Sequence, residues 1–129
     1  MTSARIDMDG LVATYRLEGT QLVVELVGNA DHRTSEQVRD LCVQLHATAL
    51  AATVTAAVLD LRQLEFMNSS CFKALVTWVS DIQDLEPAKR YKIRAFSNPG
   101  IPWQKRSLQS LQYFAVDLVS VEYPPSPAS

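Results

Sequence analysis

The stretch that decides the fold is VLDLRQLEFMNSS, residues 58–70, which joins an apolar run to a polar helix start. Ala56–Leu61 is nearly continuous in apolar character, which predicts a central strand covered on both faces. Asn and Ser are favoured caps, so we expect a helix to begin at Asn68 or Ser69. The segment Leu61–Asn68 would then be a loop at the carboxyl end of a strand, where functional residues concentrate. The helix would bury one stripe, formed by Phe72, Leu75, Val76, Val79 and Ile82.

Upstream of this stretch, residues 12–17 and 21–27 are β-rich runs separated by a short polar turn, which predicts an antiparallel hairpin. The sequence Thr34-Ser35-Glu36-Gln37 matches a capping box, in which the Thr34 hydroxyl accepts from the Gln37 amide. We therefore expect a helix to begin there, with Cys42 as a small buried hydrophobe. Its apolar stripe would comprise Val38, Leu41, Cys42, Leu45 and Ala49.

Downstream, residues 91–96 alternate like a strand near the sheet edge, and Pro102 opens a short third helix. Residues 118–121 close the sheet. The predicted order is β-β-α-β-α-β-α-β, an α/β fold with a mixed β-sheet and helices mainly on one face. We divide the chain into an N-terminal segment (1–11), one domain (12–122) and a frayed tail rich in proline and serine (123–129).

Composition excludes several classes of protein. The chain has 129 residues, 47% of them hydrophobic, and a net charge of −2, which fits one folded domain and disfavours general nucleic-acid binding. Cys42 and Cys71 lack zinc-site spacing, and the acidic start lacks the apolar core of a signal peptide. The longest uncharged stretch, 47–59, is too short to cross a bilayer. We expect a cytoplasmic protein with no metal and no cofactor.

The predicted second helix carries hydroxyls in its first turn, at Ser69 and Ser70. First-turn amides have no partner within the helix, and the helix dipole favours negative charge at this end. A phosphoryl group added here would bring a charge of about −1.5 to −2 without necessarily breaking the helix. Lys73 follows four positions after Ser69 and would supply a cation on the same face.

These residues resemble a known family. Val58–Ser70 is similar to the signature of STAS domains, the family that includes bacterial anti-sigma factor antagonists, and Leu26–Thr34 resembles the family's Gly-x-hydrophobic-Asp segment. With element order included, the resemblance covers residues 12–122. It implies a STAS-like single domain acting as a non-enzymatic switch, in which a partner kinase phosphorylates the first hydroxyl after the acidic position. That position is Ser69 here.

The sequence departs from the family signature at Asn68, where the family has Asp, and at Cys71, where it has Gly. In a divergent branch that carries Asn-Thr-Ser-Ser, the hydroxyl after Asn is the phosphoacceptor, so Asn68 is compatible with switching. The resemblance implies protein partners: a serine kinase or anti-sigma factor, or another signalling client, and a phosphatase. The candidate docking surface comprises Asn29, Asp31, His32, Arg33, Asn68, Ser69, Ser70, Cys71 and Lys73.

Other interpretations remain open at this point. The same fold can serve as a phosphorylation-independent scaffold or ligand-sensing module, and Cys71 with His32 could form a thiol nucleophile and its base. We expect a monomer or a weak dimer, without nucleic acid or membrane among its partners. A basic stretch, favoured as a solvated strand face over a docking patch, contains Lys89, Arg90, Lys92, Arg94, Lys105 and Arg106.

Overall fold

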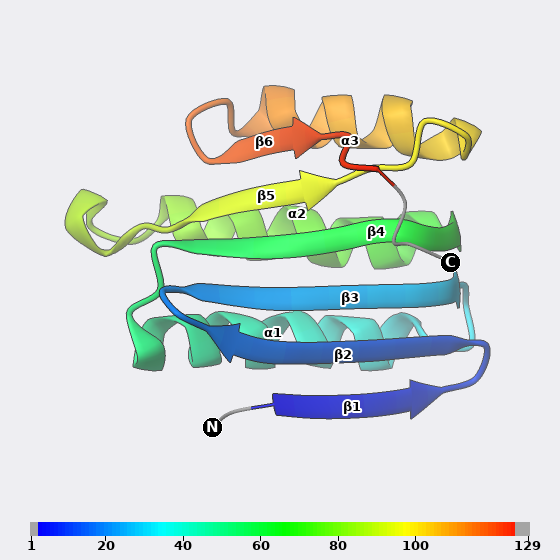
Figure 1. The fold of residues 1–129 in the computed structure, drawn as a ribbon, viewed down its shortest axis with the longest axis horizontal. Helices are drawn as coiled ribbons and strands as arrows, with labels where there is room; N and C mark the ends of the chain where they lie inside the picture. The colour runs from blue at the N-terminus through cyan, green and yellow to red at the C-terminus, as the bar shows by residue number, and fades with distance from the viewer. Residues whose placement is uncertain (1–2, 126–129) are drawn as a thin grey trace.

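One six-stranded sheet, in the order β1-β2-β3-β4-β5-β6, organises the computed structural model, which describes residues 3–125 (Figure 1). The first three strands are antiparallel neighbours, and β3 to β6 run parallel. The strands are β1 (Ser3–Met8), β2 (Leu11–Glu18), β3 (Gln21–Ala30), β4 (Ala56–Met67), β5 (Lys92–Phe96) and β6 (Val119–Glu122). The helices are α1 (Ser35–Ala52), α2 (Ser69–Gln83), α3 (Pro102–Phe114) and a 3-10 turn (Pro87–Lys89).

All three α-helices lie on one face of the sheet, behind the strands in Figure 1. Each helix connects two neighbouring parallel strands, and successive strands are added toward the same edge, so right-handed crossovers place every helix on the same side. The predicted fold class, with helices mainly on one face, is confirmed. No helix among the described residues is long and apolar enough to cross a membrane.

The hydrophobic core lies between the sheet and the helices. Both predicted stripes contribute to it, although Phe72 and Val76 are only partly buried. Cys42 is buried, as predicted, and burial raises the pKa of its thiol to about 12. Trp78, absent from the predicted α2 stripe, is among the largest buried side chains. The buried residues of α2 are Cys71, Ala74, Leu75, Trp78, Val79 and Ile82.

The sequence-based division placed residues 1–11 outside the domain, but strand β1 is part of the sheet. Ser3–Met8 pairs antiparallel with β2 along its whole length. Its exposed positions carry Arg5 and Asp7, while its apolar residues are only half-buried, so the hydrophobic pattern of this edge strand is weak. At the other end, the described part of the tail reaches Pro125, whose carbonyl accepts from Arg62. Residues 126–129 of the predicted tail lie outside the described part.

The segment Leu61–Asn68 is not the loop that the sequence predicted, because β4 continues to Met67. Strand β3 pairs with it to the end, with two register shifts, whereas β5 stops opposite Asp60. Side chains after β5 replace the missing strand. The Gln104 Nε2 donates to the carbonyls of Leu61 (2.6 Å) and Leu64 (2.9 Å), Asn98 Nδ2 to Arg62 O (3.1 Å), and Trp103 Nε1 to Glu65 O (2.9 Å).

Three of the six basic side chains of the basic stretch, those of Arg90, Lys92 and Arg94, bond within the fold. Arg90 donates to the carbonyls of Leu85 and Gln83 near the end of α2. Lys92 donates to the carbonyl of Asp117, and Arg94 forms an ion pair with Glu122 at 2.7 Å. These bonds favour the solvated strand face over the docking patch.

The buried hydroxyl of Tyr91 joins α1 and α2 to the segment directly before β5, which gives a stability prediction. The Tyr91 Oη accepts from Trp78 Nε1 (2.8 Å) and lies 2.6 Å from His46 Nδ1. Replacing Tyr91 by phenylalanine removes this oxygen and leaves the indole N–H without its partner. We expect the free energy of unfolding to fall by about 1–3 kcal/mol in urea denaturation. The exposed Tyr113→Phe control should change it little.

Candidate functional site

The β3–α1 loop and the first turn of α2 meet at the carboxyl end of the parallel strands. The Asn68 N–H donates to Ala30 O at 2.8 Å, which ties the end of β4 to the end of β3. Asn68 is also the helix cap that the sequence predicted, because its Oδ1 accepts from the Cys71 N–H at 2.8 Å. Its Nδ2 donates to Ser35 Oγ at 3.4 Å. One side chain therefore joins the starts of α1 and α2.

The start of α1 differs from the predicted capping box. The helix begins at Ser35, immediately after Thr34, but the Thr34 side chain makes no cap bond to the helix. Instead, Thr34 Oγ1 donates to Asp31 O at 3.1 Å, because the residue is buried beneath the loop with near-helical backbone angles. The Asp31 carbonyl also accepts from the Thr34 N–H and from Ser35 Oγ. The loop is thus closed on itself.

Cys71 packs the first turn of α2 against the β3–α1 loop from the core side. It is fully buried, so the prediction that it contacts a partner is wrong for the structure as folded. Its Sγ lies 3.8 Å from both Asp31 O and Ser35 Oγ, which packs the first turn of α2 against the loop. Within residues 3–125 the thiol has no imidazole among its polar contacts, and His32 is exposed in the loop. This geometry does not support a Cys–His nucleophile.

An ion-pair cluster fixes the outer side of the loop. Arg33 binds Asp31 at 2.8 Å and Asp9, in the β1–β2 turn, at 3.2 Å. The hydrogen bonds from the Arg33 side chain and backbone lower the pKa of the Asp31 carboxyl from 3.8 to about 2. The guanidinium remains charged, since the pKa of Arg33 is raised by the same partner. The sequence placed Asp31 and Arg33 in the loop, but nothing in it indicated Asp9.

This cluster gives a pH prediction. A carboxyl whose pKa is lowered by folding contributes stability above its unfolded value, and that contribution is lost as pH falls from 3.8 toward about 2. Arg33→Gln removes the main cause, so the pKa of Asp31 should rise toward 3.8. Carbon-detected NMR titration of the carboxyl measures it. A midpoint unchanged by the substitution would show that Arg33 is not responsible.

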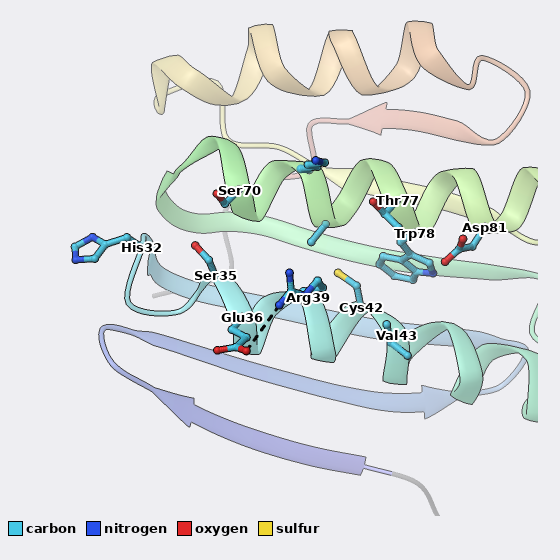
Figure 2. A pocket seen from close by; sticks show the side chains of 12 residues that line it. His32, Ser35, Glu36, Arg39, Cys42, Val43, Ser70, Thr77, Trp78 and Asp81 are labelled. Atoms are coloured by element: carbon cyan, nitrogen blue, oxygen red, sulfur yellow. Dashed lines mark ion pairs between the residues drawn. The ribbon is translucent and has the colours of Figure 1, made fainter.

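The hydroxyls of the first turn of α2 are accessible. Ser69, Ser70 and Lys73 are all exposed. They do not face the same surroundings, however. Ser70 and Lys73 line a groove of about 510 Å³ between α1 and α2, together with His32 from the loop and Arg39 from α1 (Figure 2). Ser69 is outside that lining and is presented to solvent next to the loop.

Two further residues, Asn29 and Phe66, lie at the same ends of β3 and β4. Asn29, at the end of β3, is half-buried, donates its N–H to Gly10 O, and pairs with Phe66 on β4. The Phe66 side chain is 47% exposed, two positions before the Asn68 cap. Phe66 lies within the stretch that resembles the family signature, and nothing in the sequence indicated its exposure, which arises where β4 passes beyond β5.

No family model and no curated protein matches the sequence. An anti-sigma factor antagonist from Mycobacterium paratuberculosis has a similar structure, with a TM-score of 0.59 and 19% identity over 90% of this chain and 87% of that one.

Two structures of the anti-sigma factor antagonist SpoIIAA are also similar, each with a TM-score of 0.56. The unphosphorylated form is 21% identical over 75% of this chain and 81% of its own, and the phosphorylated Bacillus form is 20% identical over 85% and 90%. Likeness at this level of identity shows the fold. The chain therefore has the STAS-like fold of the anti-sigma factor antagonists, and the predicted resemblance is confirmed for the architecture.

Proposed function

We propose that this protein is a cytoplasmic partner-switching regulator whose docking to a kinase, an anti-sigma factor or a related signalling client is controlled by phosphorylation of Ser69. The observation that carries the proposal is the position of Ser69, exposed in the first turn of α2 beside the β3–α1 loop. A kinase can reach this hydroxyl, and a partner that covers the loop would also cover it. A protein of the same fold has been solved in phosphorylated and unphosphorylated forms.

The site can accept a phosphate without unfolding. Asn68 caps the helix through the Cys71 amide, which leaves the earlier first-turn amides and the positive end of the helix dipole near Ser69. Lys73 is four residues further along α2 and exposed, so it can approach the added charge. The modified and unmodified forms would then share one fold and differ in surface charge, which is what a reversible docking switch requires.

The proposed docking surface combines the loop residues Asn29, Asp31, His32 and Arg33 with the start of α2. Phe66, paired with Asn29 and two residues before the Asn68 cap, adds an exposed aromatic side chain, the type of residue that anchors interfaces. We expect Phe66→Ala to weaken partner binding at least about tenfold, measured by isothermal titration calorimetry. Tyr113→Ala, at an exposed position on α3, is the matched control. Equal affinity of the Phe66→Ala and parent proteins would show that Phe66 is not part of the docking surface.

The test of phosphorylation is intact-mass measurement after co-expression with candidate serine kinases encoded by neighbouring genes. We expect one phosphoryl addition that is absent in Ser69→Ala and present in Ser70→Ala. An unchanged mass with a kinase that binds the protein would favour the alternative, a phosphorylation-independent scaffold or ligand-sensing module.

The groove between α1 and α2 is the observation that favours this alternative. Its volume of about 510 Å³ is within the range of small-molecule sites, and Trp78 contributes to its lining (Figure 2). Binding of a metabolite that changes partner affinity equally in the parent and in Ser69→Ala would identify the protein as a sensor. Within residues 3–125 there is no cluster of three or more His, Cys, Asp or Glu side chains suited to a metal.

A further inference from the structure

Strand β1 forms one edge of the sheet, and no strand of the described part of the chain pairs with its outer side (Figure 1). Its six residues alternate between exposed and half-buried side chains. Edge strands with free backbone groups are templates for pairing with another chain. We infer that β1 pairs antiparallel with β1 of a second copy, about a two-fold axis at Ile6, to form a weak dimer with one continuous sheet. This inference is independent of the proposed switch at Ser69.

The backbone of β1 is compatible with this pairing. In an antiparallel hairpin, residues alternate between hydrogen-bonded and non-hydrogen-bonded pairs. Met8 and Leu11 flank the two-residue turn, so they form the hydrogen-bonded pair that closes it. The backbone N–H and C=O groups of Ile6 and Ala4, at alternate positions before Met8, therefore also point toward β2. On the other edge of β2, Asn29 donates to Gly10 O, which agrees with this alternation. The residues whose backbone groups point outward are Ser3, Arg5 and Asp7.

Charge selects the register. A two-fold axis at Arg5 would place Arg5 opposite its own copy, and an axis at Asp7 would place two carboxylates together, which is unfavourable. With the axis at Ile6, each Arg5 is opposite Asp7 of the other copy, and both residues have outward backbone groups. The two side chains are about two-thirds exposed, and within residues 3–125 they form an ion pair with each other along the strand at 3.1 Å, which they can exchange for pairs across the axis.

The opposite face of β1 supplies apolar contact. Ala4, Ile6 and Met8 are half-buried and pack against the margin of the core. In the proposed register Ile6 is next to its own copy and Met8 is next to Ala4 of the other molecule, so each gains apolar neighbours. An interface limited to one short strand is small, which predicts weak association. Because β1 is three strands away from β4, the first turn of α2 stays free in both copies.

A charge-swap experiment tests the register. Sedimentation velocity from micromolar to millimolar concentrations should show reversible dimers for the full chain, weakened by salt. Arg5→Asp and Asp7→Arg each create two like-charge pairs and should raise the dissociation constant at least about tenfold. Mixing these two variants restores both opposite-charge pairs, so the mixture should form heterodimers. A parent protein that stays monomeric, or a mixture that does not associate, would overturn the inference.

A crosslink tests the position of the axis without relying on charge. Opposed Cα atoms in a non-hydrogen-bonded pair are about 4.5 Å apart, within the span of a disulfide. Ile6→Cys should therefore form disulfide dimers with diamide, since Cys42 and Cys71 are buried. Ala4→Cys, opposite Met8 of the other copy, is the control and should crosslink much less. Equal crosslinking of both variants would contradict the register, and circular dichroism checks that both are folded.

Discussion

Gln104→Leu is expected to lower the free energy of unfolding by about 3 kcal/mol or more. The Gln104 side chain is fully buried in the first turn of α3, and both ends of its amide are bonded. Its Nε2 donates to the carbonyls of Leu61 and Leu64, while its Oε1 accepts from Ser97 Oγ (3.1 Å) and Asn98 N (2.8 Å). Leucine has a similar volume and satisfies none of these groups, so several buried polar atoms lose their partners.

Urea denaturation measures this loss, with Gln109→Leu on the exposed side of α3 as the control. Gln104 secures the part of β4 that extends beyond β5 toward Asn68 and Ser69. Amide hydrogen exchange should therefore accelerate first in residues 61–67 of the variant. A variant with parent-like stability would show that water or rearranged side chains replace the glutamine, and that the end of β4 does not depend on it.

The second large effect concerns Ser69 itself. We expect Ser69→Asp to weaken partner binding at least about tenfold relative to Ser69→Ala, because a partner surface shaped for a neutral hydroxyl would bury an uncompensated charge. Ser70→Asp is the matched control: it places the same charge one residue further on, in the α1–α2 groove beside Lys73. Calorimetric titration with the partner measures all three variants. Equal affinities for Ser69→Asp and Ser69→Ala would count against an electrostatic switch.

Local signals predicted much of this structure. The apolar stripes of α1 and α2 and the Asn68 cap were visible because each depends on residues within one or two turns. The extension of β4 was not, because the donors that satisfy its carbonyls come from Asn98, Trp103 and Gln104, more than thirty residues later. A polar segment such as 62–66 therefore resembled a loop.

In the candidate site, too, local features were predictable from the sequence and contacts between distant residues were not. The sequence pointed to Ser69 through its position after a cap and its match to a family signature, and to the loop through its resemblance to a family segment; both stay predictions as binding residues. It could not show that Cys71 is sealed beneath Asp31 and Ser35, because that contact joins two elements forty residues apart. Nor could it show that Arg33 reaches Asp9 or that Ser70, rather than Ser69, lines a groove. Tertiary packing decided which of the predicted residues are exposed and which are buried.

One phosphoryl group on Ser69 is proposed to change which protein can dock. The most direct test is to install phosphoserine at position 69 through the genetic code and to measure partner binding by calorimetry beside the unmodified protein. We predict that the unmodified protein binds and that the phosphoserine form, still folded by circular dichroism, does so at least about tenfold more weakly. Indistinguishable dissociation constants for the two forms would contradict the account.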